Sequence, residues 1–557
     1  MKFNFKKKKI LLLIFTIIFL LPNFFWLYLS YKNKTFPYYE LGYLYRKIDR
    51  EVNKLFSSEK DYALKIINKQ YIDNNIFYEK DNKIDTIYLP LKVKTINLNQ
   101  LVQIAQKGGS LTIVKNKILI VDRLGNFFIF DFNNVKKINT TIQNNLVNYL
   151  NNYSGKNIKF TSDTLRTYSI VFDEKEKNLY VSYTKFIEKN VIRLVVSRIK
   201  FDLAAESFFG EWEDIFSSED LFESAPSSQF GGGKMVIFKR DLYLTVGYAY
   251  EKFFNNQLYS SSDDINSATG KVIKINLDTK NTEVITRGHR NSQGLTVLTN
   301  GKIISTEHGD QGGDKINEIV KGSHYGYPHK SFGTSYGTYQ LSGSDDQNSK
   351  YKDPIYYFSP SIGISSVIES TNFNPKWNNN WLIGSLKART LYRAHVLDNR
   401  IISVEPIWIG DRIRDIVELN QKIIILTDQA TIIILEVDND QLKKNIRYNN
   451  LDAGGLYVSL NDKLNKCVQC HSFTETNPTS LAPSLYKIFN KKIASDNYQN
   501  YSQALKSKSD LIWNYSNLFS YIKDPQNFSP GTTMPQLELE KRDIDDIINL
   551  LKKQSLQ

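Results

Sequence analysis

Two cysteines and one histidine carry the most specific chemistry in this chain. The 557 residues hold only two cysteines, and both lie in the run Cys467-Val468-Gln469-Cys470-His471. Cys-x-x-Cys-His is the attachment pattern of a c-type haem, in which both thiols bond to the haem and the histidine ligates the iron. A zinc site would need further Cys or His ligands nearby, and a redox dithiol would need a βαβ setting. The pattern therefore predicts a covalent haem c at this run.

Met534 is the candidate for the iron ligand opposite His471. It is the one methionine between residues 441 and 557, and it lies in the polar run PGTTMP. A methionine usually fills an apolar core, but the two flanking prolines and the polar neighbours favour a ligand here. A thioether opposite a histidine raises the haem potential and suits electron transfer.

A second group of residues combines cations with glycine-rich loops. Its members are Arg290, Asn291, Lys387, Arg412 and Arg414. The two arginines at 412 and 414 are two positions apart, so on extended backbone their side chains share one face. Glycines beside charged groups are typical of backbone that approaches a ligand closely. Each stretch taken alone is also compatible with an ordinary loop that carries surface charge.

The elements that must position these residues are predicted to be many short strands. Between residues 96 and 440, runs of β-branched and aromatic residues recur between turn signals without intervening helices. This texture favours a sandwich, a barrel or a propeller. About 345 residues are too many for one sandwich, whereas six blades of four strands would fit.

The two ends of the chain differ from this β-rich part. Residues 441–557 read as helices and loops, with a helix expected near 540–553. Residues 1–9 hold five lysines, and residues 10–31 carry no charged side chain. A helix of about 20 apolar residues crosses the hydrocarbon core, and a flanking lysine cluster stays in the cytoplasm. We expect a basic cytoplasmic segment at 1–9, a transmembrane anchor at 10–31 and a stalk or N-terminal extension at 32–95. A cleaved signal peptide is the alternative.

The net charge of +14, from 72 basic and 58 acidic residues, by itself admits a nucleic-acid partner. However, the first 34 residues hold seven lysines and no acidic residue, so half of the excess flanks the predicted anchor. Because the anchor places the remaining chain outside the cytoplasm, we expect no nucleic-acid partner.

The C-terminal part resembles class I cytochrome c. The resemblance covers the Cys-x-x-Cys-His motif, the runs APSL at 482–485 and KKIA at 491–494, and the Met534 loop. It implies an all-α cytochrome c domain at 441–557. In that family, haem of this kind is attached outside the bacterial cytoplasm, which agrees with the predicted topology.

Residues 96–435 resemble the soluble quinoprotein sugar dehydrogenases of the glucose/sorbosone dehydrogenase family. The shared runs, in family order, are HRNSQG at 289–294, EHGD at 307–310, FSPSI at 358–362, GSLK at 384–387 and RIRD at 412–415. The resemblance implies a fold that is mainly β, with a six-bladed β-propeller at 96–440 between the N-terminal transmembrane helix and the all-α cytochrome c domain.

The same resemblance implies two cofactors in the propeller. Pyrroloquinoline quinone (PQQ) would be bound by Arg290, Asn291, Lys387, Arg412 and Arg414, and arginine forks suit its three carboxylates. Calcium would be bound by the backbone carbonyls of Gly309 and Asp310, because a hard cation prefers oxygen ligands. Four cations that face one cavity would be unfavourable without such an anion.

Three positions depart from the family pattern. The family's general-base histidine is replaced by Gln229, whose amide cannot take up a proton near neutral pH. An acidic residue expected near the substrate is replaced by Tyr248, and Lys315 replaces an acidic residue expected to ligate a second, structural calcium. The positions expected to bind PQQ are kept, whereas those of the proton-abstraction step are changed.

These residues predict a membrane-anchored quinohaemoprotein dehydrogenase in the periplasm, held at the bacterial inner membrane. It would oxidise a sugar or a related alcohol or aldehyde and pass electrons through the haem to a respiratory acceptor, such as another cytochrome or an oxidase. The alternative is a non-catalytic or relay propeller that binds a ligand or partner and carries an electron-transfer cytochrome c.

The haem prediction is tested by Cys470→Ala. One thioether bond is lost in this variant, so we expect haem that is weakly attached or absent, measured by haem staining of denatured protein and by the pyridine haemochrome spectrum. Undiminished covalent haem in the variant would contradict the assignment.

Overall fold

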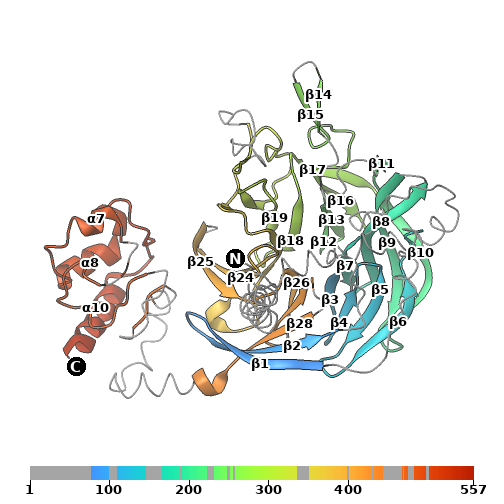
Figure 1. Cartoon of the computed structure of the whole chain (residues 1–557). Helices are drawn as coiled ribbons and strands as arrows, with labels where there is room; N and C mark the ends of the chain where they lie inside the picture. Colours follow the sequence, from blue (N-terminus) through green and yellow to red (C-terminus); the bar gives the residue numbers. More distant parts are fainter. Residues whose placement is uncertain are drawn as a thin grey trace, which may run out of the picture.

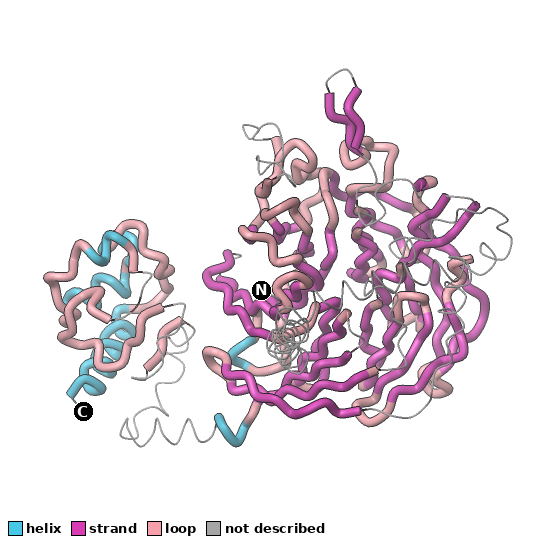
Figure 2. The backbone as a smooth tube through the Cα atoms, in the orientation of Figure 1, coloured by secondary structure: helices cyan, strands magenta, loops and turns pink. Residues whose placement is uncertain are grey.

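The computed structural model describes most of the β-rich domain and of the C-terminal segment (Figures 1 and 2). The described residues are 77–98, 109–145, 166–188, 191–222, 231–247, 251–254, 257–334, 350–397, 400–428, 431–442, 467, 470–473, 482–496, 498 and 501–556. Within these ranges no helix is both long and apolar enough to cross a membrane. The segments predicted at 1–9 and 10–31, and most of the stalk predicted at 32–95, lie outside them.

Six antiparallel sheets, which we call blades 1 to 6, build the large domain in the described part of the chain. Blade 1 holds β3 (Ser110–Val114), β4 (Lys117–Val121), β5 (Asn126–Phe130) and β6 (Val135–Thr141). Blade 2 holds β7 (Thr167–Asp173), β8 (Asn178–Glu188), β9 (Val191–Asp202) and β10 (Ser207–Ser217), with the short β11 (Leu221–Phe222) paired to β9. Blade 3 holds β12 (Gly232–Phe238), β13 (Asp241–Val246), β16 (Lys271–Asn276) and β17 (Thr282–Arg287).

The remaining blades continue the same pattern. Blade 4 holds β18 (Ser292–Val297), β19 (Ile303–Glu307), β20 (Asp314–Glu318) and β21 (Tyr356–Phe358). Blade 5 holds β22 (Ile364–Glu369), β23 (Trp381–Ser385), β24 (Thr390–Leu397) and β25 (Arg400–Trp408). Blade 6 holds β26 (Ile413–Leu419), β27 (Lys422–Thr427), β28 (Thr431–Val437), β2 (Pro90–Asn97) and β1 (Phe77–Asp85). A separate hairpin, β14 (Glu251–Phe254) with β15 (Gln257–Ser260), projects from blade 3 (Figure 1).

The blades close into a ring around one axis. Their innermost strands contact one another in the order β3, β7, β12, β18, β22 and β26, and β26 contacts β3 again. This closed order is that of a six-bladed propeller, as predicted, and closure leaves only the short outer edges of the sheets exposed.

The ring closes with strands that the sequence analysis places outside the propeller. β2 pairs with β28 from Leu91–Val437 to Asn97–Thr431, and β1 pairs with β2. Both strands belong to blade 6, so the predicted boundary between a stalk at 32–95 and the propeller is corrected to include residues 77–95. β1 has the polar sequence FYEKDNKID, and it forms a strand because the edge of β2 supplies its backbone partners.

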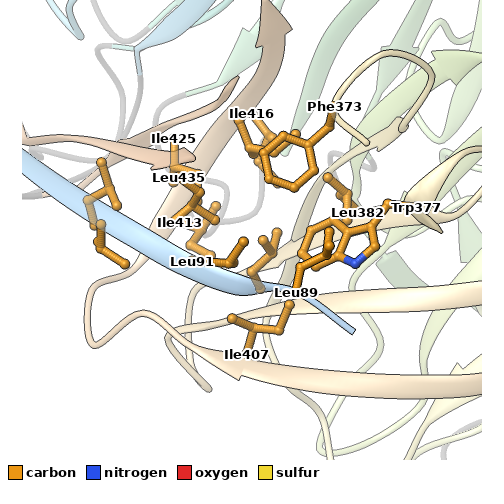
Figure 3. Close-up of a cluster of buried hydrophobic side chains, with 14 residues drawn as sticks. Leu89, Leu91, Phe373, Trp377, Leu382, Ile407, Ile413, Ile416, Ile425 and Leu435 are labelled. Atoms are coloured by element: carbon orange, nitrogen blue, oxygen red, sulfur yellow. The ribbon is translucent and has the colours of Figure 1, made fainter. Parts of the chain in front are cut away.

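The hydrophobic core lies between successive blades rather than in one centre. Figure 3 shows the cluster between blades 5 and 6, where Leu91, Ile413 and Leu435 face Leu382 and Trp377. Central strands such as β5, buried at every position, contact a neighbouring blade on each face. Such strands read as continuous apolar runs, which explains why the sequence shows many short apolar stretches without clear alternation.

The described C-terminal segment is helical. Its helices are α7 (Gln503–Lys506), α8 (Tyr515–Lys523), α9 (Pro525–Phe528) and α10 (Lys541–Leu556). α10 confirms the helix predicted near the C-terminus, and it buries Ile544, Ile547, Ile548 and Leu551 against the core that holds Cys467.

A buried carboxylate joins four blades at the axis. Asp415 of β26 accepts hydrogen bonds from the hydroxyl groups of Ser110 in β3 (2.6 Å) and Ser366 in β22 (2.8 Å), and it pairs with the ammonium of Lys234 in β12. Burial alone would raise the pKa of Asp415, but Lys234 and these donors outweigh it and hold the pKa below its ordinary value. The carboxylate is therefore ionised at neutral pH.

Asp415→Asn should lower the free energy of unfolding of the propeller by about 3–5 kcal/mol, because it leaves the largely buried Lys234 ammonium without its counter-charge. Urea unfolding followed by tryptophan fluorescence measures the loss. The wild-type advantage should be present above the ordinary aspartate pKa of about 3.9 and should disappear as the pH falls below it. The exposed Asp440, which pairs with Lys92, is the matched control, and Asp440→Asn should change stability by less than about 0.5 kcal/mol.

Candidate functional site

The predicted site residues gather at one end of the axis because of strand direction. In blade 4, Ser292 at the start of β18 pairs with Glu307 at the end of β19, so residues 290–291 and 308–313 meet at that end. In blade 5, Ile364 pairs with Ser385, which brings the connection that holds Lys387 to the same end. Every innermost strand begins at this end, which we call the axial mouth.

Arg412 and Arg414 lie on one face of the chain, as their spacing predicts. Both guanidinium groups donate to the carboxylate of Asp428, at 2.8 Å each, and this carboxylate is fully buried. Burial and the nearby charges of Arg166 and Arg412 lower the pKa of Arg414, although Asp428 opposes them. Two guanidinium cations therefore share one carboxylate at this position.

Arg290 is held on its backbone and on its side chain. Its backbone N–H donates to Glu307 at 2.7 Å, and its guanidinium pairs with Asp310 at 2.8 Å. The ring of Tyr327 lies 5.9 Å from the guanidinium carbon. The sequence assigns only the backbone of Asp310 a role, whereas the structure also uses its side chain.

A small cavity opens at the axial mouth. Its lining residues are Arg166, Tyr168, Gly232, Lys234, Gln293, Ser365, Arg414 and Asp415. Three of them are cations and one is a carboxylate, so the cavity favours an anion. Sequence reasoning missed Arg166 and Lys234. Only their place in the fold identifies these two residues, because each lies at or near the start of an innermost strand.

Asn291 sits against the backbone that follows Gln229. A Cβ atom added to Gly231 would lie 1.2 Å from the amide oxygen of Asn291, so only glycine permits this approach. Gln293 donates to the same oxygen. Gln229 and Tyr248, the two positions where the proton-abstraction pattern changes, lie outside the described residues.

The loop expected to bind calcium is organised by Asp314. This carboxylate accepts the backbone N–H groups of Gly309 (3.0 Å), Ile362 (3.0 Å) and Ile364 (2.9 Å). The hydroxyl of Ser361 lies 3.5 Å from the carbonyl oxygen of Asp310.

Lys315 places an ammonium where the resemblance suggests a second calcium. Its Nζ atom lies 3.5 Å from Glu307, whose carboxylate also contacts His289 (2.9 Å) and Asn317 (3.0 Å). Burial would raise the pKa of Glu307, but Lys315, His289 and the backbone N–H of Arg290 lower it to about 2.

Two further side chains at the mouth each leave one polar atom without a partner among the described residues. The Nε2 atom of His308 is shielded from solvent and makes no hydrogen bond. Burial, together with the charges of Arg290 and Arg414, lowers the pKa of this imidazole to about 4, although Asp314 opposes them. The side chain of Lys387 is exposed, and no ion pair joins it to a described residue. A neutral acceptor and a cation are therefore left available to a ligand.

The haem motif forms a turn with an oriented histidine. The backbone N–H groups of Cys470 and His471 donate to the carbonyl of Cys467, at 3.2 and 3.0 Å. Nδ1 of His471 lies 2.7 Å from the carbonyl of Pro483, so it carries the proton and Nε2 is left to ligate a metal. Met534 packs on the apolar cluster that includes Cys467. These residues fit a haem.

Fold and site together define a class: a six-bladed propeller with a cationic cavity on its axis, joined to a cytochrome-like segment. The sequence profile described as glucose/sorbosone dehydrogenase matches residues 110–435. The chain therefore belongs to the glucose/sorbosone dehydrogenase family and, through its C-terminal part, to the cytochrome c family.

Three curated relatives illustrate the two parts. Aldose sugar dehydrogenase YliI of Escherichia coli is 24% identical over 240 residues, which cover 39% of this chain and 63% of the relative. Quinoprotein glucose dehydrogenase B of Acinetobacter calcoaceticus is 34% identical over 136 residues, which cover 20% and 28%. Cytochrome c of Theileria parva is 35% identical over 91 residues, which cover 16% and 77%. The chain spans less than two thirds of the length of these two dehydrogenases.

The lowered pKa of His308 predicts that the stability of the folded protein depends on pH. Because its folded pKa of about 4 lies below the ordinary value of about 6.5, its contribution is present above pH 6.5 and is lost as the pH falls towards 4. His308→Gln should therefore flatten the slope of unfolding free energy against pH in that window, by up to about 1.4 kcal/mol per unit. Urea midpoints at pH 5 and 6 measure it.

His395 offers a comparison away from the mouth. Burial and Arg393 lower its pKa to about 4 as well, so His395→Gln should flatten the slope similarly. An unchanged slope in the His308 variant beside a flatter one in the His395 variant would show that His308 is protonated in the folded protein at pH 5.

Proposed function

We propose that this chain is a membrane-anchored, periplasmic quinohaemoprotein dehydrogenase that oxidises a sugar or a related alcohol or aldehyde. The observation that carries the proposal is the excess of cations around the axial cavity, in a chain that also holds a cytochrome c segment. Electrons would leave through the haem to a respiratory acceptor, such as another cytochrome or an oxidase.

PQQ is the cofactor that the axial mouth fits. Arg290, Asn291, Lys387, Arg412 and Arg414 would hold its carboxylates, and bidentate arginine contacts give such an anion a fixed orientation. When bound, PQQ supplies a quinone that accepts two electrons. Asp310 and Asp428 already pair with three of the four cations, so they keep the guanidinium groups in place before a ligand arrives.

Calcium is proposed at the carbonyl groups of Gly309 and Asp310. Oxygen ligands suit this hard cation, and it would act as a Lewis acid beside the quinone. The three backbone bonds that Asp314 accepts hold the loop in a fixed shape. The chain therefore provides a rigid loop for the ion.

The haem would be bonded to Cys467 and Cys470 and ligated by His471 and Met534. The Pro483 carbonyl fixes the ring of His471, and a thioether as second ligand raises the potential, which suits an electron acceptor. Fusion to the propeller keeps this acceptor at an effective concentration of about millimolar.

The location is proposed from residues 1–31. Five lysines before an uncharged run of 22 residues favour an inner-membrane anchor with the bulk of the chain in the periplasm. Haem attachment outside the cytoplasm, implied by the cytochrome resemblance, agrees with this orientation.

Gln229 and Tyr248 support a second candidate function. Without the general-base histidine, the rate of sugar oxidation should be lower by about 10² to 10⁴. The second candidate is therefore a propeller that binds a ligand or partner and carries an electron-transfer cytochrome without oxidising sugars itself.

Reconstitution separates the two functions. The purified full chain, loaded with haem, is incubated with PQQ and Ca²⁺ and offered aldoses, alcohols and aldehydes. We expect PQQ to bind and at least one substrate to reduce the haem, measured at its α-band. Binding without haem reduction on any substrate would favour the second candidate.

Gln229→His is the matched variant for this experiment. It should increase sugar oxidation if only the base has been lost, with PQQ binding unchanged. Failure of the wild-type chain to bind PQQ would contradict the quinoprotein proposal in both forms.

A further inference from the structure

Two of the six histidines of the chain share one carboxylate beside the axial mouth. Nε2 of His324 lies 2.7 Å from one oxygen of Asp263, and Nε2 of His329 lies 2.7 Å from the other. The carboxylate side chain is 31% exposed, and the His324 side chain is 13% exposed. Neither the PQQ site nor the haem site uses these three residues.

The hydrogen bonds of His324 fix the direction of this contact. The backbone N–H of Gly326 donates to Nδ1 of His324 at 3.0 Å, so Nδ1 holds the lone pair and Nε2 carries the proton. Nε2–H therefore donates to Asp263, and the donor hydrogens of both histidines keep the pKa of Asp263 well below its usual range despite its burial. A ring nitrogen that holds its proton does not ligate a metal, and no metal-binding cluster occurs in the described residues.

Asp263 belongs to a loop that is fixed at its base. The Nζ atom of Lys271 donates to the carbonyls of Ser261, Ser262 and Thr269, at 2.8 to 2.9 Å. The carbonyl of Ser262 also accepts the backbone N–H of Gly288 at 3.3 Å. This loop of blade 3 is therefore a rigid attachment point, and it lies next to Gly288, two positions before Arg290.

The histidines belong to residues 324–334, a segment that we call the strap. The strap touches both halves of the proposed cofactor site. Tyr327 donates its backbone N–H to Gly288 at 3.0 Å and places its ring beside Arg290. At the other end, Gln311 donates its backbone N–H to Thr334 at 3.0 Å, in the loop proposed to bind calcium.

We propose that Asp263 is a positioning residue for the cofactor site. By holding His324 and His329, it clamps the strap to blade 3 and thereby keeps Tyr327 against Arg290 and Thr334 against the 309–312 loop. The inference rests on the proposed PQQ site, which it deepens by adding a residue that contacts no cofactor.

The clamp needs a carboxylate and not only a polar side chain. Two N–H donors converge on Asp263, and an amide offers them one oxygen. In Asp263→Asn the amide NH₂ would face the second donor. His324 cannot reverse its donor, because its Nδ1 accepts from Gly326, so the amide NH₂ meets His329. His329 can keep this contact only by moving its proton to Nδ1, and the bond then loses the charge of the carboxylate. The contact with His329 is therefore the one expected to weaken.

The first test is PQQ affinity of the full chain with haem bound. Asp263→Asn should weaken PQQ binding about tenfold, which corresponds to about 1.4 kcal/mol, because Tyr327 and Thr334 are then held less firmly against the site. The neighbouring Asp264 is exposed and accepts the N–H of Asn266 at 2.9 Å. Asp264→Asn is thus the matched control and should bind PQQ like the wild type.

A second-site variant separates a specific clamp from general destabilisation. In Asp263→Asn with His329→Glu, the amide oxygen accepts from His324 and the amide NH₂ donates to the new carboxylate, so the hydrogen-bond directions match again. We expect PQQ affinity to return to within about threefold of the wild type. An Asp263→Asn variant that binds PQQ normally, or a double variant no better than the single one, would overturn the proposal.

Hydrogen exchange provides a readout that does not depend on PQQ. Without cofactor, Asp263→Asn should increase amide exchange in peptides from residues 324–334 and leave those from β27 unchanged. Unchanged exchange in the strap would overturn the clamp. Faster strap exchange in a chain whose wild type does not bind PQQ would instead keep the clamp and reject the proposed cofactor site.

Discussion

The axis of the propeller depends on one ionised carboxylate. Six inner strands meet there, and each is an edge strand of its own sheet, so side chains must satisfy the free backbone groups and join the strands across the axis. Asp415 does so by accepting from β3 and β22 and pairing with β12. An ion in this position is favourable only while all its partners are present, and it therefore fixes the arrangement of four blades at the floor of the axial cavity.

The positive charge of the axial mouth follows from the common direction of the inner strands. Because every inner strand begins at this end, cations at strand starts converge although they are far apart in sequence. Asp310, Asp415 and Asp428 pair with Arg290, Lys234 and the two arginines of blade 6. Arg166 in the lining of the cavity adds a further cation, and the exposed Lys387 adds another at the mouth. Among the residues that the structure describes at the mouth, the balance of charge remains positive, which is the property that an anionic ligand requires.

Sequence motifs made much of the fold and of the candidate site predictable. Short strands without helices indicated the propeller, and the spacing of Arg412 and Arg414 indicated their shared face. The carboxylate partners were not predictable, because Asp428 and Asp310 meet these arginines only after β27 and the 308–313 loop are in place. The β1–β2 pair was missed because its polar sequence becomes a strand only against the edge of β28. Lys234 carries no local sign of function, since its role comes from blade order.

The pairing of β2 with β28 in blade 6 imposes an order of events on the growing chain. Leu91 pairs with Val437, 346 positions later, so β2 waits for the last blade before it finds its partner. At roughly 5–20 residues per second, that interval is on the order of half a minute during synthesis. Lys92 and Lys94 lie within β2, and charged residues on an unpaired edge discourage wrong pairing. After closure, Lys92 lies 3.4 Å from Asp438 and Asp440. The haem motif follows later still, so the ring is complete in sequence before Cys467 is made.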